Sequence, residues 1–588
     1  MKKLFKTKLP ILIVILLAIF FRFYGLNWDN GHYLHPDERY MYMTLNDIEW
    51  PVNLQQYLDP HNSPLSIAQK GYIYGTAPLF FTKWVADLFD MGVYGEVHIV
   101  ARTVSALFDL GTLLLVFLTA KKIFNKKAAL FAALFYASMV MSIQQSHFFT
   151  VDTFLIFFVM LTFYLLNDFI HKKALLSYVW IIFSGISFGL ALGSKMSALY
   201  FGVVIAGFFL IKLIKEIKEL GWVHAIIRSA EYSLLFLFFS YVLFRLTNPY
   251  FFENSSWFDL TLSKALAGTL DFNVKASAGK IMYPPSWQWY GKPDFTFLAK
   301  NIFFWGAGIP ACLMFVVGAA LLFKEKIQYL RSKKFTKLLS PESLAVIWVI
   351  FLYVYIGIAF VKSLRYIEAM LPLLAIIAGF GLAKLQFKKF HLGLIIQITI
   401  VLFALLWPFS FIHIYSQPIS RVTASQWIYQ NIPANSVITV EHWDDGIPVG
   451  LTPDEYTSSG THYIDFWPKS ISMPVYDEDN VAKLEMLYNA VSKADYIVLS
   501  SNRARLTIGQ LPEKFPYMYQ YYQHLDDGSL GYDLVYNGTS FPGLFGFEVN
   551  DTKAEEVFSV YDHPEVRIYQ RIGNISRDQF NQLLQDGN

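Results

Sequence analysis

Cysteine is almost absent from this chain of 588 residues, with Cys312 as the single example. An internal disulfide is therefore excluded, and a lone cysteine inside an apolar run is typical of a small core side chain. Charged residues are scarce as well, at 16%, whereas hydrophobic residues make up 55%. Soluble domains carry about 25% charged residues. The composition excludes an ordinary soluble protein and predicts an integral membrane protein, with no indication of a nucleic-acid partner.

The short alternating segments of a membrane β-barrel are also missing, and long apolar runs recur from Leu9 to His413 instead. About 20 apolar residues suffice to cross a bilayer as a helix. The predicted fold is a polytopic α-helical membrane protein with a C-terminal α/β domain. We place eleven transmembrane helices at 9–25, 97–120, 128–147, 152–170, 177–193, 197–214, 230–247, 300–323, 343–361, 367–384 and 393–413.

The N-terminus resembles a signal peptide, with lysines ahead of an apolar stretch, but it lacks a small-residue cleavage site. We therefore interpret it as a retained first helix. Basic clusters fall at every second junction between helices, which the positive-inside rule assigns to the cytoplasm. They are the N-terminus, 121–127, 172–173, 212–228, 324–337 and 384–389. This pattern predicts a plasma-membrane protein whose N-terminus is cytoplasmic.

The charge changes sign near residue 415. Residues 1–414 carry a net charge of +15 and residues 415–588 a net charge of −12. We predict a transmembrane catalytic domain over 1–414, with long outer loops at 26–96 and 249–299, and an extracytoplasmic domain over 415–588. Two helix-then-strand patterns, 422–431 with 436–440 and 480–492 with 496–500, predict an α/β sheet there. Strands at 558–561 and 566–572 are expected to close it as a hairpin.

Two adjacent carboxylates, Asp37 and Glu38, follow the first apolar run, with Arg39 beside them. Ionisable groups at the membrane edge are candidates for function because inserting one costs about 2.5–3.5 kcal/mol. Transfer of a sugar from a lipid phosphate to a hydroxyl would need a carboxylate base and fixed cations for the leaving phosphate. Further cations predicted on the same face are Arg102, Lys195 and Arg365.

Several motifs, in their order along the chain, resemble the GT-C integral-membrane glycosyltransferases of the dolichyl-phosphate-mannose protein mannosyltransferase and aminoarabinose transferase type. The segment 35–40 is similar to the Asp-Glu motif of their first outer loop, and 100–107 to the Arg-containing start of their second helix. The matching segments further along are 145–155, 189–195, and 363–366 with 371–372. The resemblance covers residues 1 to about 415.

The resemblance implies that Asp37 is the base that activates the acceptor, and that Glu38 orients the acceptor or the loop. It implies that Asp152 is a second acid or, in some members, a metal ligand. It also implies a polyprenyl-phosphate sugar donor, inversion at the anomeric carbon, and no nucleotide cofactor. The phosphate-binding residues would be Arg39, Arg102, Lys195 and Arg365. The donor or acceptor pocket would include Tyr40, His147, Trp287, Trp289 and Tyr366.

The acceptor stays open between a glycan, a lipid and a protein. The outer loops lack the inserted MIR-type β-trefoil domain of the eukaryotic protein mannosyltransferases. No set of His, Cys and Asp has spacing that demands a metal, so a divalent metal is not indicated. Membrane lipids are the expected surroundings.

Each assignment has an alternative. Asp37 and Glu38 could cap a helix, and Asp152 could be the N-cap of the fourth helix. Lys195 and Arg365 could extend to the interface, and the tryptophans could be interfacial anchors. The alternative function is a transporter or flippase, which would bind near the bilayer midplane.

Overall fold

The computed structural model describes residues 2–67, 72, 74–173, 175–385 and 390–585. The chain divides into two units. The bundle unit comprises Met1–Leu26, Pro36–Ala278 and Pro293–Phe409. The C-terminal unit comprises Asn27–His35, Gly279–Lys292 and Ser410–Asn588. Two short stretches from the first half of the sequence therefore belong to the C-terminal unit.

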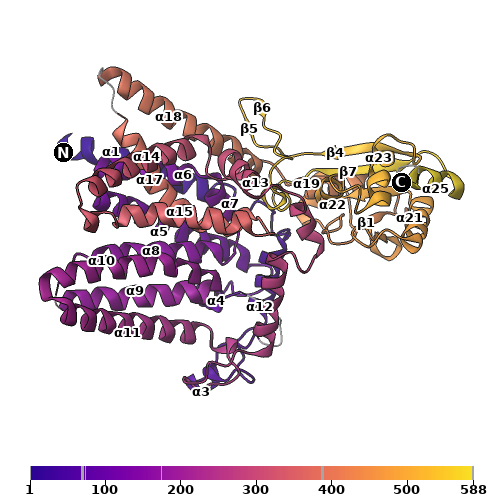
Figure 1. Cartoon of the computed structure of the whole chain (residues 1–588). Helices are drawn as coiled ribbons and strands as arrows, with labels where there is room; N and C mark the ends of the chain where they lie inside the picture. The colour runs from indigo at the N-terminus through magenta and orange to yellow at the C-terminus, as the bar shows by residue number, and fades with distance from the viewer. Residues whose placement is uncertain (1, 68–71, 73, 174, 386–389, 586–588) are drawn as a thin grey trace. The chain divides into compact units, whose positions relative to one another are not determined.

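The bundle unit is helical (Figure 1). Its helices are α1 (Lys2–Phe23), α2 (Pro36–Asn46), α3 (Leu54–Leu58), α4 (Thr76–Asp87), α5 (Val97–Ile123), α6 (Lys126–Ser138), α7 (Val140–Ser146), α8 (Asp152–Phe169), α9 (Leu175–Ser194), α10 (Gly202–Leu220), α11 (Trp222–Thr247), α12 (Lys264–Ser277), α13 (Asp294–Lys300), α14 (Ile309–Arg331), α15 (Pro341–Ile358), α16 (Leu364–Ile367), α17 (Leu371–Lys384) and α18 (Phe390–Phe411).

Among the described residues, eight helices are long and apolar enough to cross a membrane, or up to ten if each of two bent pairs counts as one span. The pair α6 and α7 bends by 60°, and Asp294–Gly306 with α14 bends by 118°. A shorter apolar helix covers Leu9–Phe23. Every predicted helix has its counterpart in this set, so the predicted polytopic helical fold is confirmed.

Helices α9 and α11 approach each other closely through glycine. A β-carbon at Gly185 would lie 2.6 Å from the carbonyl oxygen of Phe236, and one at Gly189 would lie 2.5 Å from that of Ser240. Small residues four positions apart allow two membrane helices to pack backbone against backbone. This contact fixes the end of α9, where Lys195 follows.

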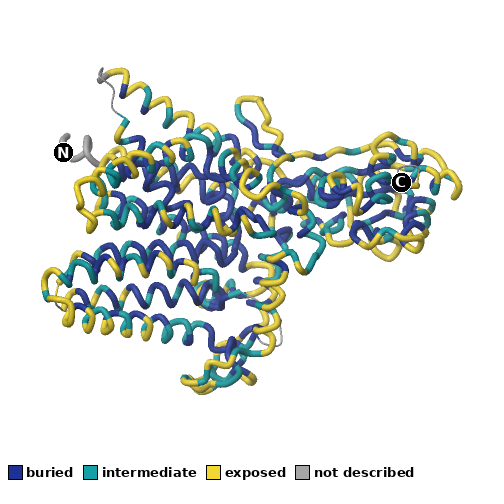
Figure 2. The backbone as a smooth tube through the Cα atoms, in the orientation of Figure 1, coloured by how far each residue is buried: buried dark blue, intermediate teal, exposed yellow. Residues whose placement is uncertain are grey.

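Many residues along α11 are exposed, as the yellow parts of the tube in Figure 2 show, and several of them are apolar. Leu234, Leu237 and Phe238 are 69%, 61% and 58% exposed. Water would oppose such a surface, whereas lipid tails accept it. The exposed face is therefore the one expected to meet the bilayer.

The C-terminal unit mixes helices with three small sheets. The antiparallel order β3-β7-β4 forms one sheet, β1 and β2 pair in parallel, and β5 and β6 form an antiparallel pair. The strands are β1 (Thr439–Glu441), β2 (Ile471–Met473), β3 (Tyr496–Leu499), β4 (Tyr532–Gly538), β5 (Gly543–Leu544), β6 (Phe547–Glu548) and β7 (Val566–Arg571). The helices are α19 (Ser420–Asn431), α20 (Pro453–Ser459), α21 (Val481–Lys493), α22 (Arg503–Ile508), α23 (Pro516–Asp526), α24 (Glu556–Ser559) and α25 (Arg577–Gln585).

The core of this unit lies around β3, whose Ile497 and Leu499 are buried with Leu487 of α21 and Tyr521 of α23. The two predicted helix-then-strand patterns are present as α19 with β1 and α21 with β3. The predicted hairpin of 558–561 with 566–572 is wrong. Residues 556–559 form the helical turn α24, and β7 pairs with β3 on one side and β4 on the other.

Candidate functional site

Four charged residues lie at the ends of separate helices of the bundle unit. Asp37 is the second residue of α2, Asp152 begins α8, Lys195 follows the last residue of α9, and Arg365 lies in the short α16. Acidic residues at a helix start are favoured by the helix dipole. Because α8 and α9 run in succession and pack together, the start of one lies beside the end of the other.

These four side chains form one connected set, which we call the four-charge cluster. Arg365 is at its centre: its Nη1 lies 2.5 Å from Asp37, and its Nε donates to Asp152 at 2.9 Å. Lys195 donates to the other oxygen of Asp152 at 2.6 Å. Two carboxylates and two cations balance in charge, which offsets the desolvation cost that an isolated buried charge would carry.

Exposure differs across the cluster. The side chain of Asp152 is 2% exposed and that of Arg365 11%, whereas that of Asp37 is 27% exposed. Asp152 contacts two cations, Lys195 and Arg365, and Asp37 contacts Arg365. Asp37 is thus the carboxylate that an incoming molecule can reach.

Glu38 has a different environment from its neighbour. It forms a buried pair with Arg102 of α5, both side chains being 0% exposed, with Nη2 2.8 Å from the carboxylate. The Tyr42 hydroxyl and the backbone N–H of Phe149 donate to the same carboxylate, at 2.8 Å and 2.6 Å. Arg102 also donates to the carbonyl of Leu26 at 3.3 Å. This set fixes α2 to the bundle.

Three tyrosines lie beside the four-charge cluster. The rings of Tyr40 and Tyr72 stack at 5.9 Å, and Tyr72 meets Tyr74 edge to face at 5.9 Å. Burial, together with the negative charge of Asp37, raises the pKa of the Tyr74 hydroxyl well above its usual value. Tyr74 is therefore a neutral hydrogen-bond donor. Sequence reasoning missed it, because a loop tyrosine before a glycine carries no signal of its own.

The structure gives each of the other predicted residues of the bundle unit its own surroundings. Arg39 is half-buried on α2. Tyr366 is 44% exposed, and Nζ of Lys195 lies 5.5 Å from its ring centre. His147 is buried with its ring nitrogens 2.8 Å from the carbonyl of Ile143 and 2.9 Å from that of Tyr24.

Trp287 and Trp289 belong to the C-terminal unit, not to the bundle unit that holds the four-charge cluster. The Trp287 ring packs edge to face on Phe515 at 5.1 Å, and Trp289 is buried. Their described contacts therefore lie within the C-terminal unit.

Glu368 is a second feature that the sequence did not indicate. It lies one helical turn after Arg365 and is 1% exposed, and neither carboxylate oxygen accepts a hydrogen bond from a described residue. Within the described part of the chain, no group of three His, Cys, Asp or Glu side chains could hold a metal ion.

The fold and the site define a class of protein: a helical membrane enzyme with a cation-held carboxylate at its helix ends. The family model described as dolichyl-phosphate-mannose-protein mannosyltransferase matches residues 77–245. The match spans less than a third of the chain and bears out the predicted resemblance to glycosyltransferases of this type. A comparison with curated proteins finds no match.

Solved structures share the fold at low sequence identity. The oligosaccharyltransferase AglB from Archaeoglobus fulgidus, in complex with an inhibitory peptide and a dolichol-phosphate, is 13% identical over 97% of this chain and 89% of that chain, with a TM-score of 0.50. The Archaeoglobus fulgidus oligosaccharyltransferase in complex with Zn and sulfate is 14% identical over 92% of this chain and 73% of that chain, also at 0.50. ArnT from Cupriavidus metallidurans bound to undecaprenyl phosphate is 15% identical over 80% and 93% of the two chains, but its TM-score of 0.40 is too low to support a conclusion.

Proposed function

We propose that this protein transfers a sugar from a polyprenyl-phosphate donor to an acceptor hydroxyl, with Asp37 as the general base. The observation that carries the proposal is the four-charge cluster, in which the accessible Asp37 carboxylate shares Arg365 with the buried Asp152. The proposed base, Asp37, is therefore in direct contact with the proposed phosphate-binding cation, Arg365.

The reaction is a single displacement. The acceptor oxygen attacks the anomeric carbon while its proton passes to Asp37, and the bond from that carbon to the phosphate oxygen breaks with inversion. The electron pair leaves with the phosphate, whose charge Arg365 and Lys195 would stabilise. A guanidinium suits this task because its planar donors match phosphate oxygens. A positioned base contributes about 10²–10⁴-fold to such a rate.

Arg365 links the two halves of the mechanism. Before the donor binds, the Arg365 guanidinium donates to the Asp37 carboxylate. A donor phosphate that binds Arg365 would compete with this contact and leave that carboxylate oxygen to take the acceptor proton. Asp152, with two cationic contacts, keeps Arg365 in place during the exchange. The donor would thus activate the base for its own transfer.

The buried position of Arg102 gives it another role than the one expected from the sequence. Its guanidinium is occupied by Glu38 and is 0% exposed, so we assign it to holding α2 rather than to the donor phosphate. Glu38, as the partner of Arg102, likewise holds α2 in the bundle.

The lipid-phosphate donor is supported by the family match and by the dolichol-phosphate named for AglB. The positive-inside pattern supports a cytoplasmic N-terminus, with chemistry at the outer surface of the plasma membrane and residues 415–588 forming an extracytoplasmic domain. The acceptor is a glycan, lipid or protein hydroxyl. No nucleotide cofactor takes part.

The test uses the purified protein in lipid with a panel of radiolabelled polyprenyl-phosphate sugars. Label transferred to water or to added hydroxyl acceptors is counted for the wild type and for Asp37→Asn. Transfer of one sugar that depends on Asp37 is the expected result. Equal transfer by Asp37→Asn would remove Asp37 from the role of base, and binding of none of the donors would overturn the proposed reaction.

A further inference from the structure

The nine residues that precede α2 belong to the C-terminal unit rather than to the bundle unit. This segment is Asn27–His35, and its side chains Trp28 and Leu34 are buried. The His35 ring is buried against Tyr561, with ring centres 4.1 Å apart. The segment therefore folds as an integral part of the C-terminal unit, although α2 and Asp37 follow it directly in the chain.

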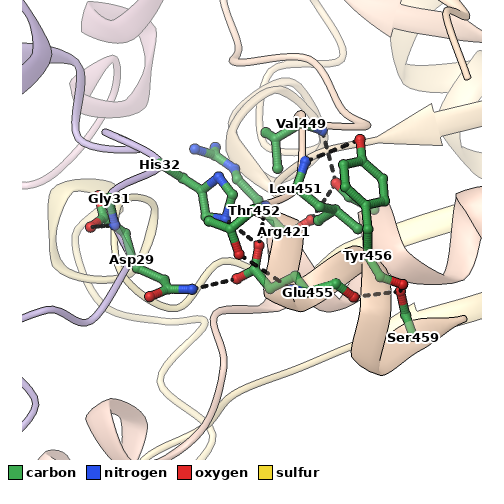
Figure 3. A network of polar contacts seen from close by, with 12 residues as sticks. Asp29, Gly31, His32, Arg421, Val449, Leu451, Thr452, Glu455, Tyr456 and Ser459 are labelled. Atoms are coloured by element: carbon green, nitrogen blue, oxygen red, sulfur yellow. Dashed lines mark hydrogen bonds and ion pairs between the residues drawn. The ribbon is translucent and has the colours of Figure 1, made fainter. Parts of the chain in front are cut away.

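Glu455 of α20 also contacts this segment (Figure 3). The side-chain amide of Asn30 donates to Oε1 at 2.8 Å, and Nε2 of His32 lies 2.8 Å from Oε2. We call these three residues the Glu455 clamp. Burial opposes ionisation of this carboxyl, but hydrogen bonds from Asn30 and the Thr452 backbone, with the His32 ring, lower its pKa overall. The clamp is therefore a charged, hydrogen-bonded contact.

Glu455 is itself fixed by its own helix. Thr452 is the N-cap of α20, its hydroxyl accepts from the backbone N–H of Glu455, and its backbone N–H donates to Oε2 of Glu455 at 2.8 Å. This reciprocal pair is a capping box, which restrains the glutamate side chain. A restrained carboxylate can set the position of the residues that bind it.

We propose that the Glu455 clamp positions Asp37 for catalysis, by fixing the segment from which the chain enters α2. Asn30, His32 and Glu455 are positioning residues in this view. The proposal rests on the function proposed above for Asp37. Pro36 separates the segment from Asp37 by a single residue, and proline restricts both its own φ and the residue before it. A displacement of residues 30–35 is therefore carried into the first turn of α2.

Three variants separate the clamp from the helix that carries it. Asn30→Ala combined with His32→Ala removes both contacts of the segment with Glu455 and leaves the capping box of α20 intact. Thr457→Ala removes an exposed hydroxyl of α20 that donates to the carbonyl of Pro453, and leaves both the capping box and the clamp contacts in place. His32→Gln, with Asn30 unchanged, supplies an amide donor in place of the ring and serves as the rescue variant.

The measurements are kcat, the KM for the lipid-phosphate donor, and hydrogen exchange of residues 27–46 in the full chain. The Ala pair is expected to lower kcat by about 10- to 100-fold, in line with the cost of a displacement of about 1 Å at a reacting group. The donor KM should stay within about twofold, because the contacts of Arg365 and Lys195 with Asp152 are untouched. Exchange over 27–46 should rise, and His32→Gln should restore most of kcat.

Thr457→Ala is expected to leave kcat near the wild-type value. If the Ala pair leaves both kcat and exchange unchanged, or if Thr457→Ala lowers kcat as much, the clamp does not position Asp37. Exchange does not depend on which reaction the enzyme performs. Faster exchange over 27–46 without any sugar transfer by the wild type would sustain the clamp and overturn the proposed function instead.

Discussion

Asp37 and Glu38 are neighbours in sequence but have opposite environments. The Glu38 carboxylate accepts from Arg102, Tyr42 and the Phe149 backbone, and its side chain is 0% exposed. The Asp37 carboxylate is 27% exposed and contacts Arg365, which it shares with Asp152. One carboxylate is enclosed by the fold, and the other faces a cation that has a second partner.

The difference shows how one residue of an acid pair can have a structural role while its neighbour has a chemical one. A carboxylate enclosed by three donors has little capacity left to accept a substrate proton. A partly exposed carboxylate with a shared cation can exchange that cation for a substrate. Removing each acid in turn should therefore give two unlike phenotypes, one in catalysis and one in stability.

The largest expected effect is the catalytic one. Asp37→Asn should lower kcat by about 10²–10⁴-fold because the amide cannot take the acceptor proton. The unfolding midpoint in detergent should change little, since the residue is partly exposed. Asp47→Asn, an exposed acid just beyond α2, is the matched control and should retain wild-type turnover. A fall of less than about tenfold in Asp37→Asn would place the base elsewhere.

The effect on Glu38 should appear mainly in stability. Glu38→Ala leaves Arg102 buried without its carboxylate, which costs about 3–5 kcal/mol. The measurements are the folded fraction and thermal unfolding in detergent, with turnover per folded molecule falling far less than in Asp37→Asn. Replacing both residues, as Glu38→Leu with Arg102→Met, should recover part of the lost stability. Unchanged stability in Glu38→Ala would contradict the enclosed role.

A smaller effect is expected at the phosphate side of the cluster. Lys195→Met should raise the donor KM about 10-fold, consistent with one charge-assisted hydrogen bond of about 1.5–3 kcal/mol. Lys122→Met is the matched control, because Lys122 also pairs with an aspartate of α8, Asp168, at the other end of that helix. Equal donor KM values for the two variants would contradict a phosphate role for Lys195.

A buried carboxyl of the C-terminal unit extends the comparison to an acid that accepts a hydrogen bond from a neutral partner. Glu441 of β1 accepts from the Tyr522 hydroxyl, and burial raises its pKa to about 8. A glutamate in the unfolded chain releases its proton at about pH 4.3, whereas Glu441 in the folded protein keeps its proton up to about pH 8. Stability of the C-terminal unit should therefore fall as the pH rises through this window.

The Glu441→Gln variant tests whether ionisation of Glu441 causes this pH dependence of stability. The amide cannot release a proton, so the slope of stability against pH between about 4.3 and 8 should become flatter. Glu513→Gln, at an exposed glutamate of the same unit, should leave the slope unchanged. Parallel slopes for Glu441→Gln and the wild type would show that Glu441 ionises at its ordinary pH.

Much of the bundle could be predicted from the sequence, because apolar runs must match the bilayer thickness and basic clusters mark one side. The motifs also named all four members of the four-charge cluster. Their pairing could not be predicted, since a guanidinium can pair with any carboxylate that the tertiary fold brings near. Arg102 was expected at the donor phosphate for this reason, although it is enclosed with Glu38.

Features that depend on long-range packing also could not be predicted from local sequence patterns. Tyr74 acquires its neighbours only when its loop meets the end of α9. Residues 558–561 have strand-like composition, but β7 already has a neighbour on each side, so no edge remains for them. The membership of Asn27–His35 and Gly279–Lys292 in the C-terminal unit likewise has no signature in composition.

The Glu455 clamp has a consequence for biosynthesis. Asn30 and Glu455 are 425 positions apart, so at about 5–20 residues per second a ribosome adds the second roughly 20–85 s after the first. During that interval Asn27–His35 must wait without the partner that holds it. A nascent or truncated chain that ends before Glu455 carries Asp37 without the clamp. The chain would thus become catalytically active only late in synthesis. An incomplete chain that lacks Glu455 would not transfer sugar from the lipid donor.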